Sequence, residues 1–132
     1  MKLNSSEAKN LLEFERQKAK DDRWIDHCLC VGESAGKIAN ALNEKGYNVN
    51  IDKAITFGYL HDIGKYNGES HGHVMRGYNY LKDKGYDEEY CNICLTHSYL
   101  NNDIPLVKVV DNFLIGTQKR HSIAMSFIKY VY

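Results

Sequence analysis

The stretch of sequence that decides the fold is Tyr59-Leu60-His61-Asp62-Ile63-Gly64-Lys65. It ends the most apolar run of the chain, so His61 and Asp62 fall where a core is expected. Imidazole and carboxylate groups are stable in a core only when they are paired or bound to a metal. Gly64 is expected to end the helix in the left-handed backbone region, and Lys65 adds a cation beside the pair. The stretch therefore predicts a buried polar site at the end of a central helix.

Outward from this stretch, apolar residues recur at steps of three and four, and Pro105 is the single proline. This pattern predicts an all-α fold, a compact bundle of about six or seven helices. The expected helices cover about residues 6–20, 23–43, 53–62, 73–82, 87–97, 103–116 and a closing segment after 117, with a loop over 65–72. Residues 107–110 alone also fit a short strand. The third helix is apolar on nearly every side, which predicts a central position.

Three helix starts have recognisable capping residues. Asn4 or Ser5 is the expected N-cap of the first helix, Asp52 that of the third and Asp87 that of the fifth. Short polar side chains at these positions accept hydrogen bonds from the first backbone N–H groups of a helix.

Length and charge limit the class of protein. The 132 residues suffice for one domain with one sizeable core, which we expect to span residues 1–132. The 17 basic and 17 acidic residues cancel, so the charge balance predicts no nucleic-acid or membrane surface. The N-terminus lacks an apolar signal core, and no apolar run approaches the roughly 18–20 residues of a membrane span. We therefore expect a cytoplasmic protein that binds a small ligand.

The four cysteines do not predict a zinc site. Cys28 and Cys30 are two residues apart on an expected helix and point to nearly opposite sides, so they cannot share a tetrahedral zinc ion without unwinding. Like Cys91 and Cys94, they are expected to be small hydrophobic residues in a reducing compartment.

A set of polar residues interrupts the apolar faces of different helices, and it includes four of the six histidines. Its members are His27, His61, Asp62, His73, His97 and Asp111. Imidazole and carboxylate ligands suit first-row transition metals, and helix bundles build metal sites from side chains of facing helices. A single histidine on an apolar stripe is more often a hydrogen-bonded core or surface residue. The coincidence of the whole set instead predicts a metal centre.

In these residues the chain resembles the HD-domain metal-dependent phosphohydrolases, over about residues 24–115. The resemblance rests on five segments: His27 with the stripe Val31, Ala35 and Ala39; Gly58 to Lys65; His73-x-x-x-Gly77-x-x-x-Leu81; Leu95-Thr96-His97-Ser98; and, more loosely, Ile104-Pro105-Leu106 with Val110-Asp111. The His-Asp-Ile-Gly-Lys core with its outer histidines is a far more specific signal than a His-Asp dipeptide.

The resemblance implies that one metal ion is held by His27, His61, Asp62 and Asp111. In two-metal members, histidines matching His73 and His97 hold a second ion, and the aspartate matching Asp62 bridges. The expected cofactors are thus one or two divalent ions of iron, manganese, nickel, cobalt or zinc. The chain departs from the family in the short segment between His97 and Asp111. Asp103 or water is therefore an alternative to Asp111 as the fourth ligand of the first metal ion. The Gly-Tyr-Pro signature of the cyclic-di-GMP phosphodiesterases is also missing after His97.

Such a site predicts hydrolytic chemistry. A divalent metal lowers the pKa of bound water towards roughly 7, and Asp62 and Lys65 are the expected catalytic residues. Lys65 and Arg76 are expected to bind the substrate by neutralising charge on its phosphoryl group. The alternative for Lys65 is a solvated cation at a helix C-terminus. Among the ten tyrosines, residues 59, 66, 78 and 80 either stack on a nucleobase or pack in the core.

The expected function is hydrolysis of a phosphoester or phosphoanhydride of a small metabolite, in the first place a nucleotide, by metal-activated water. The alternatives are a dinucleoside-polyphosphate hydrolase, a nucleoside monophosphatase, a metal- or ligand-binding module without turnover, and an oxygenase with a mixed-valent di-iron site. The expected partners are the phosphorylated substrate and, in a homodimer, a second copy of the chain.

Overall fold

The computed structural model describes residues 1–96, and this part of the chain contains five α-helices, one 3-10 helix and no strand. In chain order they are α1 (Ser5–Arg16), α2 (Arg23–Glu44), α3 (Ile51–Leu60), η1 (Ile63–Asn67), α4 (His73–Asp83) and α5 (Glu88–Thr96). The all-α prediction is confirmed for residues 1–96. The helices predicted after residue 97, and with them the total of six or seven, lie outside the described residues.

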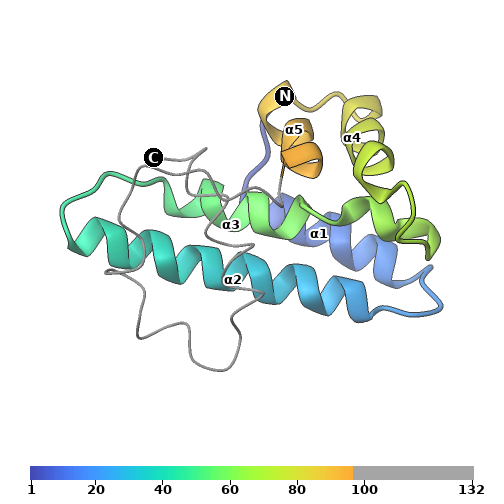
Figure 1. Cartoon of the computed structure of the whole chain (residues 1–132), viewed down its shortest axis with the longest axis horizontal. Coiled ribbons are helices and arrows are strands. Elements are labelled where there is room, and N and C mark those ends of the chain that lie inside the picture. The colour runs from blue at the N-terminus through green and yellow to red at the C-terminus, as the bar shows by residue number, and fades with distance from the viewer. Residues whose placement is uncertain (97–132) are drawn as a thin grey trace.

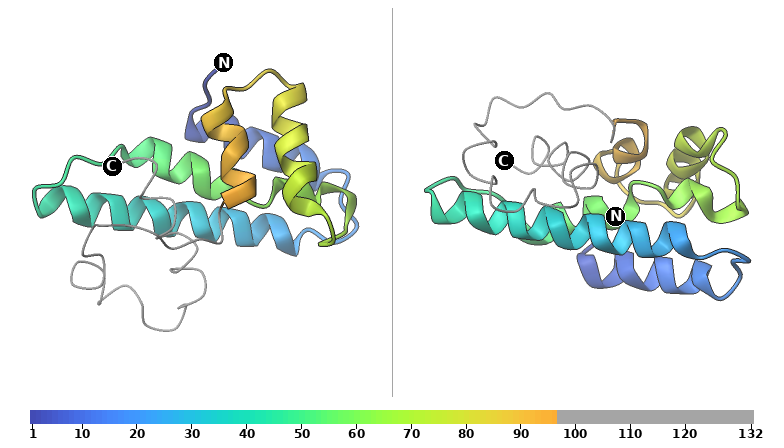
Figure 2. Two further views of the ribbon diagram at one scale, coloured as in Figure 1. Left: turned by 45° about the horizontal axis from the view of Figure 1, so that its top comes forward. Right: turned by 60° about the horizontal axis from the view of Figure 1, so that its bottom comes forward.

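The long helix α2 and the shorter α3 lie side by side and run in opposite directions, joined by the turn at residues 45–50 (Figure 1). α1 packs along this pair, while α4 and α5 form a hairpin on the other side of α3 (Figure 2). η1 connects the C-terminal end of α3 to α4 and packs against α4. The end of α3 is therefore surrounded by α2, η1 and α4.

α3 occupies the central position that its apolar sequence predicted. Six of its ten residues are buried, and they include Phe57, Gly58 and Leu60. The Phe57 ring packs edge-on against the Tyr90 ring of α5, with the ring centroids 5.5 Å apart. The most apolar helix thus fills the middle of the bundle because only a central position covers all of its sides.

Glycines let α2 and α3 touch backbone to backbone. A Cβ atom added at Gly58 would stand 2.4 Å from the Cα of Gly32 and 2.7 Å from its backbone nitrogen. Such distances are far below van der Waals contact, so neither helix accepts a side chain at this crossing. The close approach sets how near His27 on α2 comes to the end of α3.

The predicted role of Gly64 as a left-handed helix cap is wrong. Gly64 lies in η1, and the positive φ angles of residues 1–96 occur instead at Gly46, Gly68, Gly72 and Gly85. A Cβ atom at Gly64 would stand 1.8 Å from the carbonyl oxygen of His73. The glycine is thus required by contact with the α4 backbone rather than by a turn. The loop predicted over 65–72 is likewise wrong at its start, since η1 continues to Asn67.

The predicted N-cap residues are confirmed in part. Asn4 caps α1, because its side-chain oxygen accepts a hydrogen bond of 2.8 Å from the Glu7 N–H. Asn50, rather than Asp52, caps α3 by accepting from the Lys53 N–H at 3.0 Å. The Asp52 carboxylate instead accepts from the backbone and the hydroxyl of Ser5, so it ties α3 to the start of α1.

Two further features of the described part concern boundaries and cysteines. α1 ends at Arg16 rather than near residue 20, and α5 begins directly after Asp87, whose carboxylate pairs with the N-terminal amine.

All four cysteines are free thiols; residues 28, 91 and 94 are buried, as predicted, and residue 30 is half-buried. No helix within residues 1–96 combines the length and hydropathy needed to cross a membrane.

The helix crossing generates a stability prediction. Gly58→Ala should lower the free energy of unfolding by about 1–3 kcal/mol, because the new methyl group forces the α2 and α3 backbones apart. Gly36→Ala is the matched control: its methyl group meets only the Ile55 side chain, at 2.8 Å and 2.9 Å, which can rotate away. Urea denaturation measures both, and equal midpoints for the two variants would contradict the backbone contact.

Candidate metal centre

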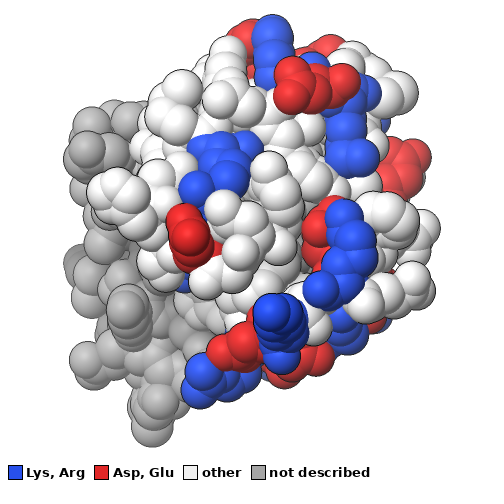
Figure 3. All heavy atoms as spheres, turned by 90° about the vertical axis from the view of Figure 1, so that its right-hand side faces the viewer, with Lys and Arg blue, Asp and Glu red and all other residues white. Residues whose placement is uncertain are grey.

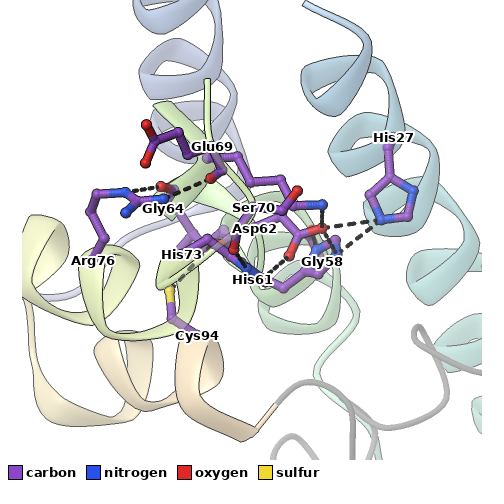
Figure 4. Close-up of polar contacts among 12 residues, drawn as sticks. His27, Gly58, His61, Asp62, Gly64, Glu69, Ser70, His73, Arg76 and Cys94 are labelled. Carbon is purple, nitrogen blue, oxygen red and sulfur yellow. Dashed lines mark hydrogen bonds and ion pairs between the residues drawn. The ribbon is translucent and has the colours of Figure 1, made fainter. Parts of the chain in front are cut away.

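Four polar side chains from different elements converge at the end of α3 (Figure 4). His27 lies on α2, His61 is the C-cap of α3, Asp62 is the N-cap of η1 and His73 is the first residue of α4. α3 ends at Leu60, and the adjacent residues 61 and 62 lie in the turn that leads to η1, where both approach this space. A continued α-helix would turn them about 100° apart.

The Asp62 carboxylate is the hub of this cluster. Its Oδ2 atom lies 3.4 Å from His27 Nε2, 3.1 Å from His61 Nε2 and 3.3 Å from Lys65 Nζ. The two imidazole nitrogens are themselves 3.2 Å apart. The other carboxylate oxygen, Oδ1, lies 3.1 Å from His73 Nε2. One oxygen therefore faces His27 and His61, while the other faces His73.

Backbone carbonyls determine which nitrogen of two histidines points into the cluster. His61 Nδ1 lies 2.6 Å from the Gly58 carbonyl oxygen, and His73 Nδ1 lies 2.6 Å from that of Ser70. A carbonyl oxygen can only accept, so each Nδ1 carries a proton and each ring directs its Nε2 atom towards Asp62. Metal-binding histidines are commonly oriented in this way by an outer hydrogen bond.

The donor set fits a divalent transition-metal ion. His61 Nε2 and Asp62 Oδ2 are 3.1 Å apart, and His27 Nε2 stands within 3.4 Å of both. A single proton at this place can satisfy one pair of these atoms, whereas a metal ion accepts lone pairs from all three. Two imidazoles and a carboxylate are ligands suited to iron, manganese, cobalt, nickel or zinc. Among the described residues, His27, His61 and Asp62 form the group whose ligand atoms can meet at one ion.

Asp62 remains ionised in this position. The residue is only 4% exposed, and burial by itself raises the pKa of a carboxyl group. The neighbouring His61, His27 and Lys65 outweigh this effect, and they hold the pKa of Asp62 well below its ordinary range. The surroundings of Asp62 thus favour the ionised carboxylate, which is the form that binds a metal.

The two cations predicted to bind substrate have different surroundings. Lys65 points its ammonium group at Asp62. Arg76 donates to three backbone carbonyls, those of Gly64 at 2.6 Å, Glu69 at 2.7 Å and His71 at 3.1 Å (Figure 4). Three of the five guanidinium N–H groups are thus used on η1 and on the loop before α4. Arg76 therefore helps to fix this loop, and its role in substrate binding stays a prediction.

The remaining sequence candidates divide into two groups. His97 and Asp111, with the alternative Asp103, lie outside the described residues. The four tyrosines are occupied within the fold: residue 59 is buried, the hydroxyls of 78 and 80 donate to glutamates, and ring 66 packs on ring 80.

Sequence reasoning missed several elements of the site. The carbonyls of Gly58 and Ser70 have no side-chain signature, although each lies three residues before the histidine that it orients. Trp24, expected on the apolar stripe of α2, is half-buried and lines a cleft beside the centre. Its position three residues before His27 is the signal that could have found it.

Comparison with known proteins identifies the class. The profile of the HD domain family matches residues 24–113, most of the chain. The chain therefore belongs to the HD domain family, as the sequence resemblance predicted.

One relative of this chain is the uncharacterized protein MJ0778 of Methanocaldococcus jannaschii, which is 37% identical over 75 residues. The shared segment makes up 55% of this chain and 43% of that protein, so the chain spans less than half of its relative's length. No solved structure matches the chain significantly.

The cluster predicts which residues retain metal. Asp62→Asn should lower the affinity for manganese or iron by roughly 100-fold or more, because the common neighbour of all three imidazoles loses its charge; even outer partners of ligands matter by 10–100-fold. His61→Ala should do the same. Elemental analysis after gel filtration measures the bound metal. His71→Ala removes an exposed histidine two residues from His73 and should change nothing; full metal content in folded Asp62→Asn protein would refute the centre.

Proposed function

We propose that this chain is a metal-dependent phosphohydrolase that cleaves a phosphoester or phosphoanhydride of a small metabolite, in the first place a nucleotide. The observation that supports this most is the convergence of His27, His61 and Asp62, with a lysine ammonium 3.3 Å from the shared carboxylate oxygen. Membership of the HD domain family supports the same chemistry. A divalent ion held by these three residues would supply Lewis acidity, lowering the pKa of a coordinated water and polarising a phosphoryl oxygen.

The protein residues contribute orientation and charge. The hydrogen bonds from His61 and His73 to backbone carbonyls hold both rings in one orientation, so the site is formed before any substrate arrives. Asp62 stays ionised and offsets part of the ion's charge within a buried environment. Preorganised groups of this kind avoid the cost of reorienting during the reaction.

Lys65 is the group that we assign to the phosphoryl oxygens. Its side chain is 27% exposed, and its ammonium pairs with the same Asp62 oxygen that faces His27 and His61. An ion bound to Asp62 would compete for that oxygen and weaken the pair. The flexible four-carbon stem of lysine then allows the ammonium to turn towards a phosphate.

The two oxygens of Asp62 also support a second ion. Oδ1 faces His73, on the side away from His27 and His61, so one carboxylate is placed to bridge two metals. His97 is the second expected ligand of that ion, and Asp111 or Asp103 is the expected further ligand of the first. All three of these assignments stay predictions.

Turnover is tested by phosphate release from nucleoside mono-, di- and triphosphates and dinucleoside polyphosphates with added manganese, nickel or cobalt. We expect release from at least one nucleotide, and loss of activity in Asp62→Asn. Lys65→Gln should lower kcat by roughly 100-fold with metal content unchanged, because one charged donor to the phosphoryl group is lost. Lys84→Gln, on the far side of α4, is the charge-matched control. Full metal occupancy with no release from any compound would indicate a binding module without turnover.

The number of metal ions that the site binds is tested separately from activity. Calorimetric titration with manganese should show two binding steps, the second weaker, and His73→Ala should remove the second step while the first remains. The reason is that His73 Nε2 lies 3.1 Å from Asp62 Oδ1, whereas His27 and His61 approach Oδ2. Two unchanged binding steps in His73→Ala would exclude His73 as a ligand, and a single step in the wild type would leave the one-metal site alone.

A further inference from the structure

A cleft of about 370 Å³ opens at one end of the bundle, between the start of α2 and the segment that follows η1. Asp21, Arg23 and Trp24 form one wall, and Lys65, Glu69 and Ser70 contribute to the other. Figure 3 views this end of the molecule, where basic and acidic side chains are interspersed rather than separated into fields of one sign.

Three residues that line this cleft connect it to the metal centre. Lys65 lines the cleft and is also 3.3 Å from Asp62 Oδ2. Ser70 lines the cleft, and its carbonyl orients His73. Trp24 precedes His27 by three residues on α2, so the two side chains lie on one face of the helix a single turn apart. A phosphate held at the metal centre by Lys65 would therefore have the rest of its molecule beside Trp24.

The walls favour a planar, uncharged group. Trp24 is the aromatic residue among the lining side chains, and it packs against the core while remaining half-exposed. Arg23 beside it is bound to Asp21 by three hydrogen bonds of 2.6–3.0 Å, so this wall carries no net charge. On the other wall, Lys65 pairs with Asp62 rather than with Glu69, so the two lining residues of this wall carry opposite charges. An indole face flanked by paired charges is suited to stacking with a heteroaromatic ring rather than to holding further phosphates.

The size of the cleft separates the substrate classes. A volume of about 370 Å³ lies at the low end of the roughly 300–1,000 Å³ range of ligand sites, which is enough for one nucleoside, so a second nucleoside would have to lie outside the cleft. We propose that the cleft binds the base of a mononucleotide by stacking on Trp24, and that the substrates are nucleoside phosphates with a single base. This inference rests on the proposed phosphohydrolase function, and it disfavours dinucleoside polyphosphates.

Trp24 is the single tryptophan of the chain, so intrinsic tryptophan fluorescence reports on this cleft alone. Titration of the zinc-loaded protein with the four common nucleoside monophosphates should quench the emission with at least one of them. Ribose 5-phosphate, which has the sugar and the phosphate but no base, should leave the emission unchanged. Equal quenching by ribose 5-phosphate, or none by any nucleotide, would overturn the assignment of the base to Trp24.

Kinetics give a second, independent test. Trp24→Leu should raise KM for the best nucleotide by about 10-fold or more, the usual effect of losing one stacked base, while kcat stays within about twofold. The KM for ribose 5-phosphate should not change, and Trp24→Phe should restore most of the nucleotide affinity. Phe14→Leu, which alters an exposed aromatic residue on α1, is the control.

The two hypotheses fail in different ways. Base-dependent quenching without phosphate release from any compound would reject the hydrolase and retain the base site. Release from nucleotides with a KM that Trp24→Leu leaves unchanged would reject the base site and retain the hydrolase. A kcat/KM higher for a dinucleoside polyphosphate than for every single-base nucleotide would also overturn the inference.

Discussion

The Asp62 carboxylate is 4% exposed, its neighbours hold its pKa well below the ordinary range, and much of the described structure is arranged around it. An isolated buried charge costs several kcal/mol, so Asp62 requires compensating partners from every neighbouring element. His27 arrives from α2, Lys65 from η1 and His73 from α4, each within 3.4 Å of a carboxylate oxygen. If the helices moved apart, the carboxylate would lose these partners, and water would not replace them fully at so buried a position. The packing of the elements around α3 and the geometry of the centre therefore depend on each other.

Backbone contacts set the distances that this requirement demands. Gly58 brings α3 against Gly32 on α2, and Gly64 brings η1 against the backbone of His73 on α4. Each of these contacts lies within a few residues of a cluster member. The carbonyl of Gly58 also accepts the hydrogen bond that orients His61, so one residue both spaces the helices and orients a ligand. Larger residues at these places would widen the cluster as well as destabilise the fold.

The sequence predicted the helices within residues 1–96 and the convergence of His27, His61 and Asp62, because both depend on residue type at regular spacing. His27, His61 and Asp62 stand out as polar residues on apolar faces, and the structure brings them together. Gly64 was misinterpreted because a glycine before a loop is compatible with either a positive φ angle or a close backbone contact, and only the position of α4 distinguishes them. The cleft at Trp24 was missed for a similar reason. A tryptophan on an apolar stripe predicts burial, and its exposed face depends on where residues 65–70 lie.

Lys65 and Arg76 show how two cations with one predicted role can acquire different ones. The guanidinium of Arg76 is planar, with donors in a rigid fork, and it matches three carbonyls of the loop that holds His73. Lysine offers a point charge on a flexible stem, which suits a group that exchanges one anion for another. With Arg76 holding the Glu69 and His71 carbonyls on either side of Ser70, the carbonyl that orients His73 is fixed in place. The rigid cation thus supports the geometry of the centre, and the flexible one is the residue that we propose for the substrate.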